Sequence, residues 1–543
     1  MAKGFRDASS LTPFVSTLTL FMVVITLQFH TNRAWAQDNA LIARTTAGPI
    51  RGIARPGGGA KFLGIPYAQP PVGDLRWHEP LPARRWKGVR NATTYATPCV
   101  QPVWYSNQHI SEISNEDCLY LNINTQAWPV KKLLPVMVFI HGGGNLTGTS
   151  SDPFSNEGTL PDHGVVLVSL DYRLGIFGYF AHPGLSRGSV HHESGNYGLM
   201  DQILALRWVV DNIANFGGDP NNIAVFGQSA GALDIGLLMT SKLAKGLFQK
   251  AVSESGPILD PTPSLATAEQ SGVRFTETLT PPAGVDAVKF LRDVPARQLL
   301  KAVASQDAQH QPQLNPDIDG WVLTRSPAAS YTSGQELAIP LLIGSNTLES
   351  GGGPETPEQA RKDIDDFMGD LAPQALALYG LTDGSQTVAD PLYGVPGVQW
   401  PSDLRFHCNA TSVALWHRAA HHPVYEYQFD HTIPGLGEKI KGAWHTFELP
   451  YVMGVFPKSG PLAGEFVEMD YKLSDLIETY WTNFAKTGNP NSDTFSHWPE
   501  LGESQIFLEF KEDGQAVAST TAQRGPQCNL YREALERNMN RKQ

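Results

Sequence analysis

A serine flanked by small residues is the first feature of this sequence that could do chemistry. In the stretch GQSAG, Ser229 has one glycine two residues before it and another two residues after it. A G-x-S-x-G pattern between a strand and a helix forms a sharp turn that exposes the serine hydroxyl as a nucleophile. The same pattern also suits a purely structural corner, because any tight turn needs small residues. The rest of the chain must decide between these two interpretations.

The sequence also contains the partners that a nucleophilic serine needs. A base must take the hydroxyl proton, and His445 follows a Gly-Ala bend and precedes an apolar run, as expected of a base on a loop after a strand. The glycines of His141–Gly144 directly follow an apolar run, so their backbone N–H groups could approach a developing oxyanion. The histidine pairs His191–His192 and His421–His422 form no H-E-x-x-H motif and are interpreted as surface polar residues.

The elements that must position these residues alternate between strands and helices. Four apolar, β-rich runs lead into loops, at residues 134–140, 165–172, 222–227 and 339–344. Such runs are typical of a sheet buried on both faces. Helical spacing follows over 198–216, and a helix is expected to continue over 232–248. This order predicts an α/β fold with a largely parallel sheet, whose reactive loops lie at the carboxyl ends of the strands. Residues 351–400 are interpreted as helical excursions over the sheet.

The N-terminus has the pattern of an export signal. Lys3 and Arg6 precede an apolar stretch at 14–29, and Ala34 to Ala36 form an A-x-A site. We therefore expect a signal peptide at 1–36 and a mature domain at 37–543, secreted or periplasmic. An uncleaved membrane anchor is the alternative, but the apolar run has about 16 residues where about 20 are needed to cross a bilayer. No stable membrane insertion is expected after cleavage.

Composition limits the partners. The net charge is -12 and no long Lys/Arg tract occurs, which argues against binding of nucleic acid. Hydrophobic residues make up 41% and charged residues 17% of the chain, as in folded globular proteins. Because we expect the chain to be exported to an oxidising compartment, we expect its four cysteines to form structural disulfides. They lack the C-x-x-C motif of a zinc or redox site. Their spacing leaves three pairings open; the cysteines are Cys99, Cys118, Cys408 and Cys528.

Several ordered motifs together resemble one known family. The segments 62–77, 114–123, 196–209, 216–220 and 226–232 are similar to those of the type-B carboxylesterase/lipase family, which includes the cholinesterases. The resemblance covers about residues 40 to 535 and suggests a bacterial secreted carboxylesterase. It implies the α/β-hydrolase fold: a large, mostly parallel central sheet flanked by helices, with helical excursions over the active-site face.

The resemblance also assigns roles to residues. It implies a serine esterase of small to medium esters, which works through a covalent acyl-enzyme and needs no metal or organic cofactor. It further implies the disulfides Cys99–Cys118 and Cys408–Cys528. The residues that match the family's catalytic positions are Ser229 as nucleophile, Glu349 as acid, His445 as base, and Gly143, Gly144 and Ala230 as oxyanion donors.

Three positions depart from the family pattern. Gln228 precedes the serine where cholinesterases carry Glu, so a charge that would hold a quaternary ammonium is missing. Asn145 stands where an aromatic residue is usual. It is expected to line the substrate pocket, as is Gln228, and to stay unglycosylated despite its NLT sequon. Asp171 stands where Asn is usual, and the sequence offers no reason. Trp104 is interpreted as a packing residue, so choline esters are poor candidates.

Two other functions compete with that of a small-molecule esterase. A lipase acting on longer acyl chains would need a long hydrophobic lid, whereas the 99–118 segment is short and polar. An extracellular binding or adhesion module of the same fold would typically lack a member of the triad, and all three members are present here. Acyl and alcohol specificity cannot be inferred from the fold, and the oligomeric state stays open.

Overall fold

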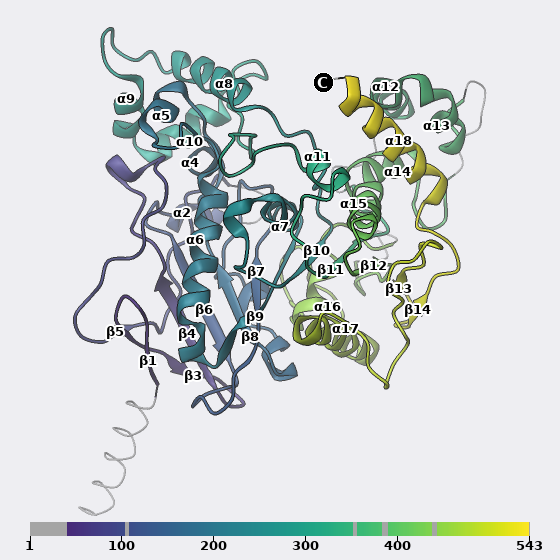
Figure 1. Ribbon diagram of the computed structural model, residues 1–543, viewed down its shortest axis with the longest axis horizontal. Helices are drawn as coiled ribbons and strands as arrows, with labels where there is room; N and C mark the ends of the chain where they lie inside the picture. The colour runs from purple at the N-terminus through teal and green to yellow at the C-terminus, as the bar shows by residue number, and fades with distance from the viewer. Residues whose placement is uncertain (1–40, 104–107, 351–355, 383–388, 437–441, 542–543) are drawn as a thin grey trace, which may run out of the picture.

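A large twisted sheet forms the centre of the molecule (Figure 1). The computed structural model describes residues 41–103, 108–350, 356–382, 389–436 and 442–541; the expected signal peptide and Trp104 lie outside these ranges. The eleven strands of the sheet have the order β14-β13-β12-β11-β10-β9-β7-β8-β6-β4-β3. Their bounds are β3 Ile53–Ala54, β4 Ala60–Pro66, β6 Tyr120–Thr125, β7 Leu134–Ile140, β8 Val166–Leu170, β9 Gly218–Gln228, β10 Lys250–Glu254, β11 Leu341–Asn346, β12 Val424–Phe429, β13 Leu508–Phe510 and β14 Ala516–Ala518.

The central strands are parallel and the edge strands are antiparallel. Pairing is parallel from β8 through β7, β9, β10, β11 and β12 to β13. It is antiparallel at β13–β14 and from β8 through β6 and β4 to β3. A smaller sheet joins β1 (Ile42–Arg44), β2 (Pro49–Arg51) and β5 (Arg90–Asn91). The parallel pairing brings the carboxyl ends of β7, β9, β11 and β12 to one edge, as the sequence predicts.

Helices cover both faces of the sheet. Side chains along β7 alternate: Val136, Val138 and Ile140 belong to an apolar cluster with α6, α15 and α18, whereas Met137 and Phe139 belong to one with α16 and α17. The helix bounds are α2 Gln108–Ile113, α3 Pro153–Asn156, α4 Gly175–Tyr179, α5 Pro183–Gly188, α6 Tyr197–Asn212, α7 Ala230–Thr240, α8 Leu265–Thr278, α9 Ala287–Asp293, α10 Ala296–Ala304, α11 Pro327–Thr332, α12 Pro357–Met368, α13 Ala372–Leu378, α14 Pro396–Ser402, α15 Cys408–Ala419, α16 Leu449–Met453, α17 Glu468–Thr487 and α18 Gly525–Arg541.

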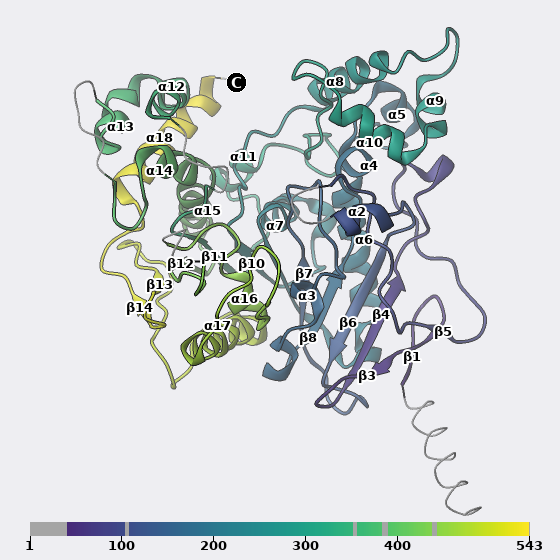
Figure 2. The same ribbon diagram turned by 180° about the vertical axis from the view of Figure 1, so that it is seen from behind.

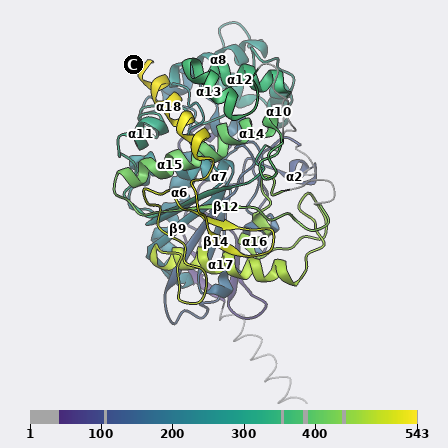
Figure 3. The same cartoon turned by 90° about the vertical axis from the view of Figure 1, so that its right-hand side faces the viewer.

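Two groups of helices extend beyond the sheet. Helices α5, α8, α9 and α10 gather at one corner, and α12, α13, α14 and α18 gather at another, as both broad views show (Figures 1 and 2). The side view shows α18 beside α15 and α16 beside α17 (Figure 3). The first group has an apolar cluster of its own. Residues 351–400 contribute α12, α13 and most of α14, so the helical excursions expected there are present in the described part.

The predicted elements differ from the observed ones mainly at their ends. Strand β7 has the predicted bounds, whereas β9 begins at Gly218, earlier than expected, and β11 ends at Asn346, later than expected. The helix predicted over 232–248 instead covers Ala230–Thr240. It stops there because Ser241 adopts extended backbone and its hydroxyl bonds the Val322 carbonyl. Within the described ranges, no helix is both long and apolar enough to cross a membrane.

Candidate active site

Ser229 lies on a strained turn between a strand and a helix. Strand β9 ends at Gln228 and α7 begins at Ala230, and between them Ser229 has φ 57° and ψ -123°. Few residues other than glycine adopt a positive φ, and such strain collects at functional sites. A Cβ atom added to Gly227 or Gly231 would lie 2.5 or 2.0 Å from the Ile140 carbonyl oxygen of β7. The two flanking glycines are therefore required because the turn passes directly against β7.

The structure brings together the three residues assigned to a triad. The hydroxyl of Ser229 lies 2.9 Å from Nε2 of His445, and Nδ1 of His445 lies 2.6 Å from Glu349. The other oxygen of Glu349 accepts from the Asn346 N–H at 2.6 Å and the Ser255 hydroxyl at 2.5 Å. The Glu349 side chain is fully buried, whereas 21% of the His445 side chain is exposed. A buried carboxylate, a partly exposed imidazole and a serine hydroxyl therefore form one continuous line of contacts.

The environment of His445 favours its protonated form. Burial alone lowers the pKa of the imidazole, but the charge of Glu349 and the hydrogen bond to it outweigh burial, so the pKa is raised. Glu448 contributes in the same direction, and Arg405 opposes it. A base with a raised pKa holds the proton of the serine more firmly when the hydroxyl attacks.

Asn346 joins the loop that carries Glu349 to the loop that carries His445. Its side-chain amide donates to the Trp444 carbonyl at 2.8 Å and to Glu448 at 2.5 Å. Its backbone N–H holds Glu349, as described above. The Leu348 N–H donates to the Ala443 carbonyl at 2.8 Å, so the two loops are paired directly as well. The only sequence signal for this role is the position of Asn346 at the end of a strand, three residues before the acid.

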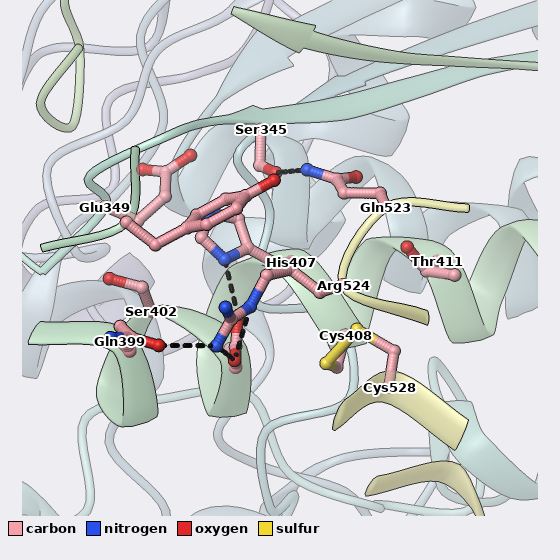
Figure 4. Close-up of polar contacts among 12 residues, drawn as sticks. Ser345, Glu349, Gln399, Ser402, His407, Cys408, Thr411, Gln523, Arg524 and Cys528 are labelled. Atoms are coloured by element: carbon pink, nitrogen blue, oxygen red, sulfur yellow. Dashed lines mark hydrogen bonds and ion pairs between the residues drawn. A yellow bond between two sulfur atoms is a disulfide. The ribbon is translucent and has the colours of Figure 1, made fainter. Parts of the chain in front are cut away.

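A buried network of charged and polar side chains contacts the loop that carries Asn346 and Glu349 (Figure 4). His407 contacts the Asn346 carbonyl at 2.7 Å through Nε2 and Asp403 at 2.7 Å through Nδ1. Arg524 donates to Asp403 and, at 3.0 Å, to Gln399. Burial raises the pKa of the Asp403 carboxyl, but Arg524 and His407 outweigh it, so the net pKa is lowered. The network therefore anchors the loop that carries Glu349 to Arg524, the residue directly before α18. Its residues are scattered along the chain, and sequence reasoning missed them.

The glycine loop lies against the turn that carries the serine. Gly143 and Gly144 have φ values of 107° and 65°, and a Cβ on Gly142 would lie 2.6 Å from the Gln228 carbonyl oxygen. The Gly143 carbonyl accepts two backbone N–H groups at 3.1 Å, which closes the loop. Among the described residues, no hydrogen bond uses the N–H of Gly143, Gly144 or Ala230. These donors are available to an oxyanion beside Ser229.

The prediction that Asn145 lines the substrate pocket is wrong. Asn145 is fully buried; its amide donates to Asp234 at 2.9 Å and its oxygen accepts from the Tyr172 hydroxyl at 3.1 Å. The backbone at Asn145 is left-handed (φ 57°). Because its side chain is buried, there is no room for a glycan on it. Gln228 is buried too, and its amide nitrogen lies 3.4 Å from Nε2 of His445. Its place in substrate binding stays a prediction.

Asp171, which the sequence left unexplained, holds the segment that follows the glycine loop. Its two carboxylate oxygens accept from the Ser150 N–H at 2.7 Å and the Ser150 hydroxyl at 2.8 Å. Burial raises the pKa of Asp171 to about 6, against an ordinary value of 3.8. Asp171 is therefore a structural residue.

The four cysteines form the two expected disulfides, Cys99–Cys118 and Cys408–Cys528. The second bridge fixes α18 to the start of α15, next to the network around His407. The described part of the 99–118 segment contains only the short helix α2, in which Ser111 alone is buried.

Comparison with known proteins decides the family. A model of the carboxylesterase family matches residues 39–379 and 396–530. The chain belongs to this family. This carboxylesterase is 34% identical to the fumonisin B1 esterase of Sphingopyxis macrogoltabida, over 88% of this chain and 87% of that protein. It is 35% identical to the para-nitrobenzyl esterase of Bacillus subtilis, over 85% and 93% of the two chains.

Solved structures give the same result for the fold. A carboxylesterase of Geobacillus stearothermophilus aligns with a TM-score of 0.77 at 30% identity, over 90% of this chain and all of that one. The carboxylesterase therefore has the α/β-hydrolase fold, which confirms the expected mostly parallel sheet flanked by helices. The protein is a serine carboxylic ester hydrolase, and a non-catalytic module of the same fold is not favoured.

Proposed function

We propose that Ser229, His445 and Glu349 are the catalytic triad of this carboxylesterase. The observation that carries the proposal is the continuous line of contacts from the Ser229 hydroxyl through His445 to Glu349, at 2.9 and 2.6 Å. His445 takes the serine proton as the hydroxyl attacks an ester carbonyl, and Glu349 fixes the tautomer of the ring and stabilises its charged form.

The same groups complete both steps of the reaction. The N–H groups of Gly143, Gly144 and Ala230 stabilise the oxyanion, each contributing about 3–4 kcal/mol. His445 then donates its proton to the leaving alcohol, which breaks the ester bond and leaves an acyl group on Ser229. Water, deprotonated by His445, attacks the acyl-enzyme and releases the acid.

Small to medium esters are the proposed substrates. The short, polar helix α2 in the Cys99–Cys118 segment supports this, since activity on aggregated lipid would need an extended apolar cover. Related proteins are named as esterases of fumonisin B1 and of para-nitrobenzyl compounds, which are discrete molecules.

We also propose that the chain is exported as a single domain, residues 37–543, after cleavage behind Ala36. Two disulfides support an oxidising compartment, either periplasmic or extracellular. Mass spectrometry of the secreted or periplasmic protein would give its first residue, and a start far from Gln37 would reject the cleavage site.

Hydrolysis of p-nitrophenyl esters from acetyl to lauroyl by residues 37–543 tests the assignment. Ser229→Ala should lose at least about 10⁴-fold in kcat, whereas Ser305→Ala, which alters an exposed serine, should keep wild-type turnover. A phosphonate ester should add one group to Ser229. Turnover that survives Ser229→Ala rejects the nucleophile, and a maximum at lauroyl would favour the lipase alternative.

A further inference from the structure

Three potential metal ligands meet at a place remote from the triad. Glu336 lies between α11 and β11, His417 lies in the last turn of α15, and His422 precedes β12. Each residue offers one ligand atom, and these three atoms all lie within 4.8 Å of one another. Glu336 and His417 are buried, and His422 is half-buried.

His417 is oriented as a metal-binding histidine would be. Its Nε2 lies 2.8 Å from the Ile339 carbonyl, which can only accept, so Nε2 carries a hydrogen. Its Nδ1 lies 2.9 Å from Glu336 and faces the cluster. Metal-bound histidines typically donate their outer N–H to a carbonyl or carboxylate, which fixes the ring and directs the other nitrogen to the ion.

One carboxylate oxygen of Glu336 is buried and unsatisfied. The residue is 6% exposed, and its other oxygen meets His417. A buried carboxylate oxygen without a partner costs free energy that a cation would recover. The ring of His422 lies 4.7 Å from that of His417, centroid to centroid, and its exposed side gives an ion a way in.

We propose that Glu336, His417 and His422 bind a divalent transition metal, with Zn²⁺ the best match. Two imidazoles and one carboxylate are a typical zinc ligand set, with water in the fourth position, whereas Ca²⁺ and Mg²⁺ prefer oxygen ligands alone. Tetrahedral ligands about 2.0–2.1 Å from zinc lie about 3.3 Å apart, so a small rotation of half-buried His422 completes the site. The proton shared by His417 and Glu336 leaves to solvent as the ion binds.

The position of the site indicates a structural role. Ile339 precedes β11 by two residues and His422 precedes β12 by two, so the cluster lies at the amino ends of these parallel strands. The triad lies at their carboxyl ends, about 20 Å away for a six-residue strand. The metal would tie α15 to the segment before β11, and turnover should not depend on it. The sequence predicted no metal site because Glu336 is 81 residues from His417.

The test uses metal-free residues 37–543 titrated with Co²⁺ and then Zn²⁺. We expect visible Co²⁺ bands of a tetrahedral site, their loss on adding Zn²⁺, and an unfolding temperature that rises with Zn²⁺ concentration. His422→Asn should weaken binding at least about tenfold, and Glu336→Gln should do the same. His421→Asn is the matched control, because His421 is exposed beside the cluster and should leave binding unchanged.

Either of two results would overturn the proposal. One is a folded wild-type protein that gives no Co²⁺ bands and no stabilisation by Zn²⁺. The other is equal binding by His422→Asn and His421→Asn, which would place the ion elsewhere. Hydrolysis of p-nitrophenyl acetate should be the same with and without Zn²⁺, and a loss of turnover in the metal-free enzyme would reject the structural role.

Discussion

Replacing Asp171 by Asn should make the protein more stable at neutral pH. The pKa of the carboxyl is about 6 in the folded chain against an ordinary 3.8, so the folded state binds the proton more tightly than the unfolded state. Wild type therefore loses stability as pH rises from 3.8 to 6 and does not regain it above that range. A difference of about 2 pKa units corresponds to about 3 kcal/mol. Asparagine resembles the protonated acid and avoids this loss.

The assay is urea unfolding followed by tryptophan fluorescence at pH 3.5 and pH 8. The gain in unfolding free energy for Asp171→Asn should be about 2–3 kcal/mol at pH 8 and near zero at pH 3.5. The Ser150 N–H keeps an oxygen acceptor in the variant, so the loop should not move. Asp211→Asn, at an exposed position of α6, should change stability by less than about 0.5 kcal/mol. A gain of the same size at both pH values, or no gain at pH 8, would refute the reasoning.

Three further perturbations follow from the geometry. Glu349→Gln should lower kcat about 10⁴-fold. It should also move the acid limb of the kcat/KM profile to lower pH, because the charge of Glu349, which does most to offset burial, is then lost and the pKa of His445 falls; a limb that stays in place would contradict this. Gly231→Ala puts a methyl group 2.0 Å from a β7 carbonyl oxygen and should destabilise by about 3 kcal/mol, which an unchanged urea midpoint would disprove. Joint replacement of Cys408 and Cys528 by Ser should cost about 2–5 kcal/mol in unfolding free energy, measured as a lower urea midpoint under non-reducing conditions; an unchanged midpoint would contradict this.

Local patterns revealed the strands and the chemistry. The apolar run before the HGGG loop predicted β7 with its observed bounds, and GQSAG located the turn at Ser229. These features depend on neighbouring residues, which a sequence displays directly. The acid, Glu349, was accessible only through resemblance to a family, because nothing in its immediate neighbours distinguishes it from other glutamates.

Features that depend on distant contacts were missed or left open. Asn145 looked like a pocket residue, yet Asp234 and Tyr172 draw its side chain into the core. The role of Asp171 needed Ser150, and that of Asn346 needed Trp444 and Glu448. In each case the partner lies on a different loop or helix, and the sequence does not show which of these segments the fold brings together.

The line from Ser229 to Glu349 has a consequence for how the enzyme matures. The serine and the histidine are 216 residues apart in the chain, and the acid and the histidine are 96 apart. Contacts between residues so far apart in the chain form slowly, because the long loop between them must close first. Helices and local hairpins can therefore form well before β9, β10, β11 and β12 are in register. On the proposed assignment, hydrolysis needs Ser229, Glu349 and His445 in contact, so activity should appear only after these strands are in register, and a chain still being folded should not hydrolyse esters.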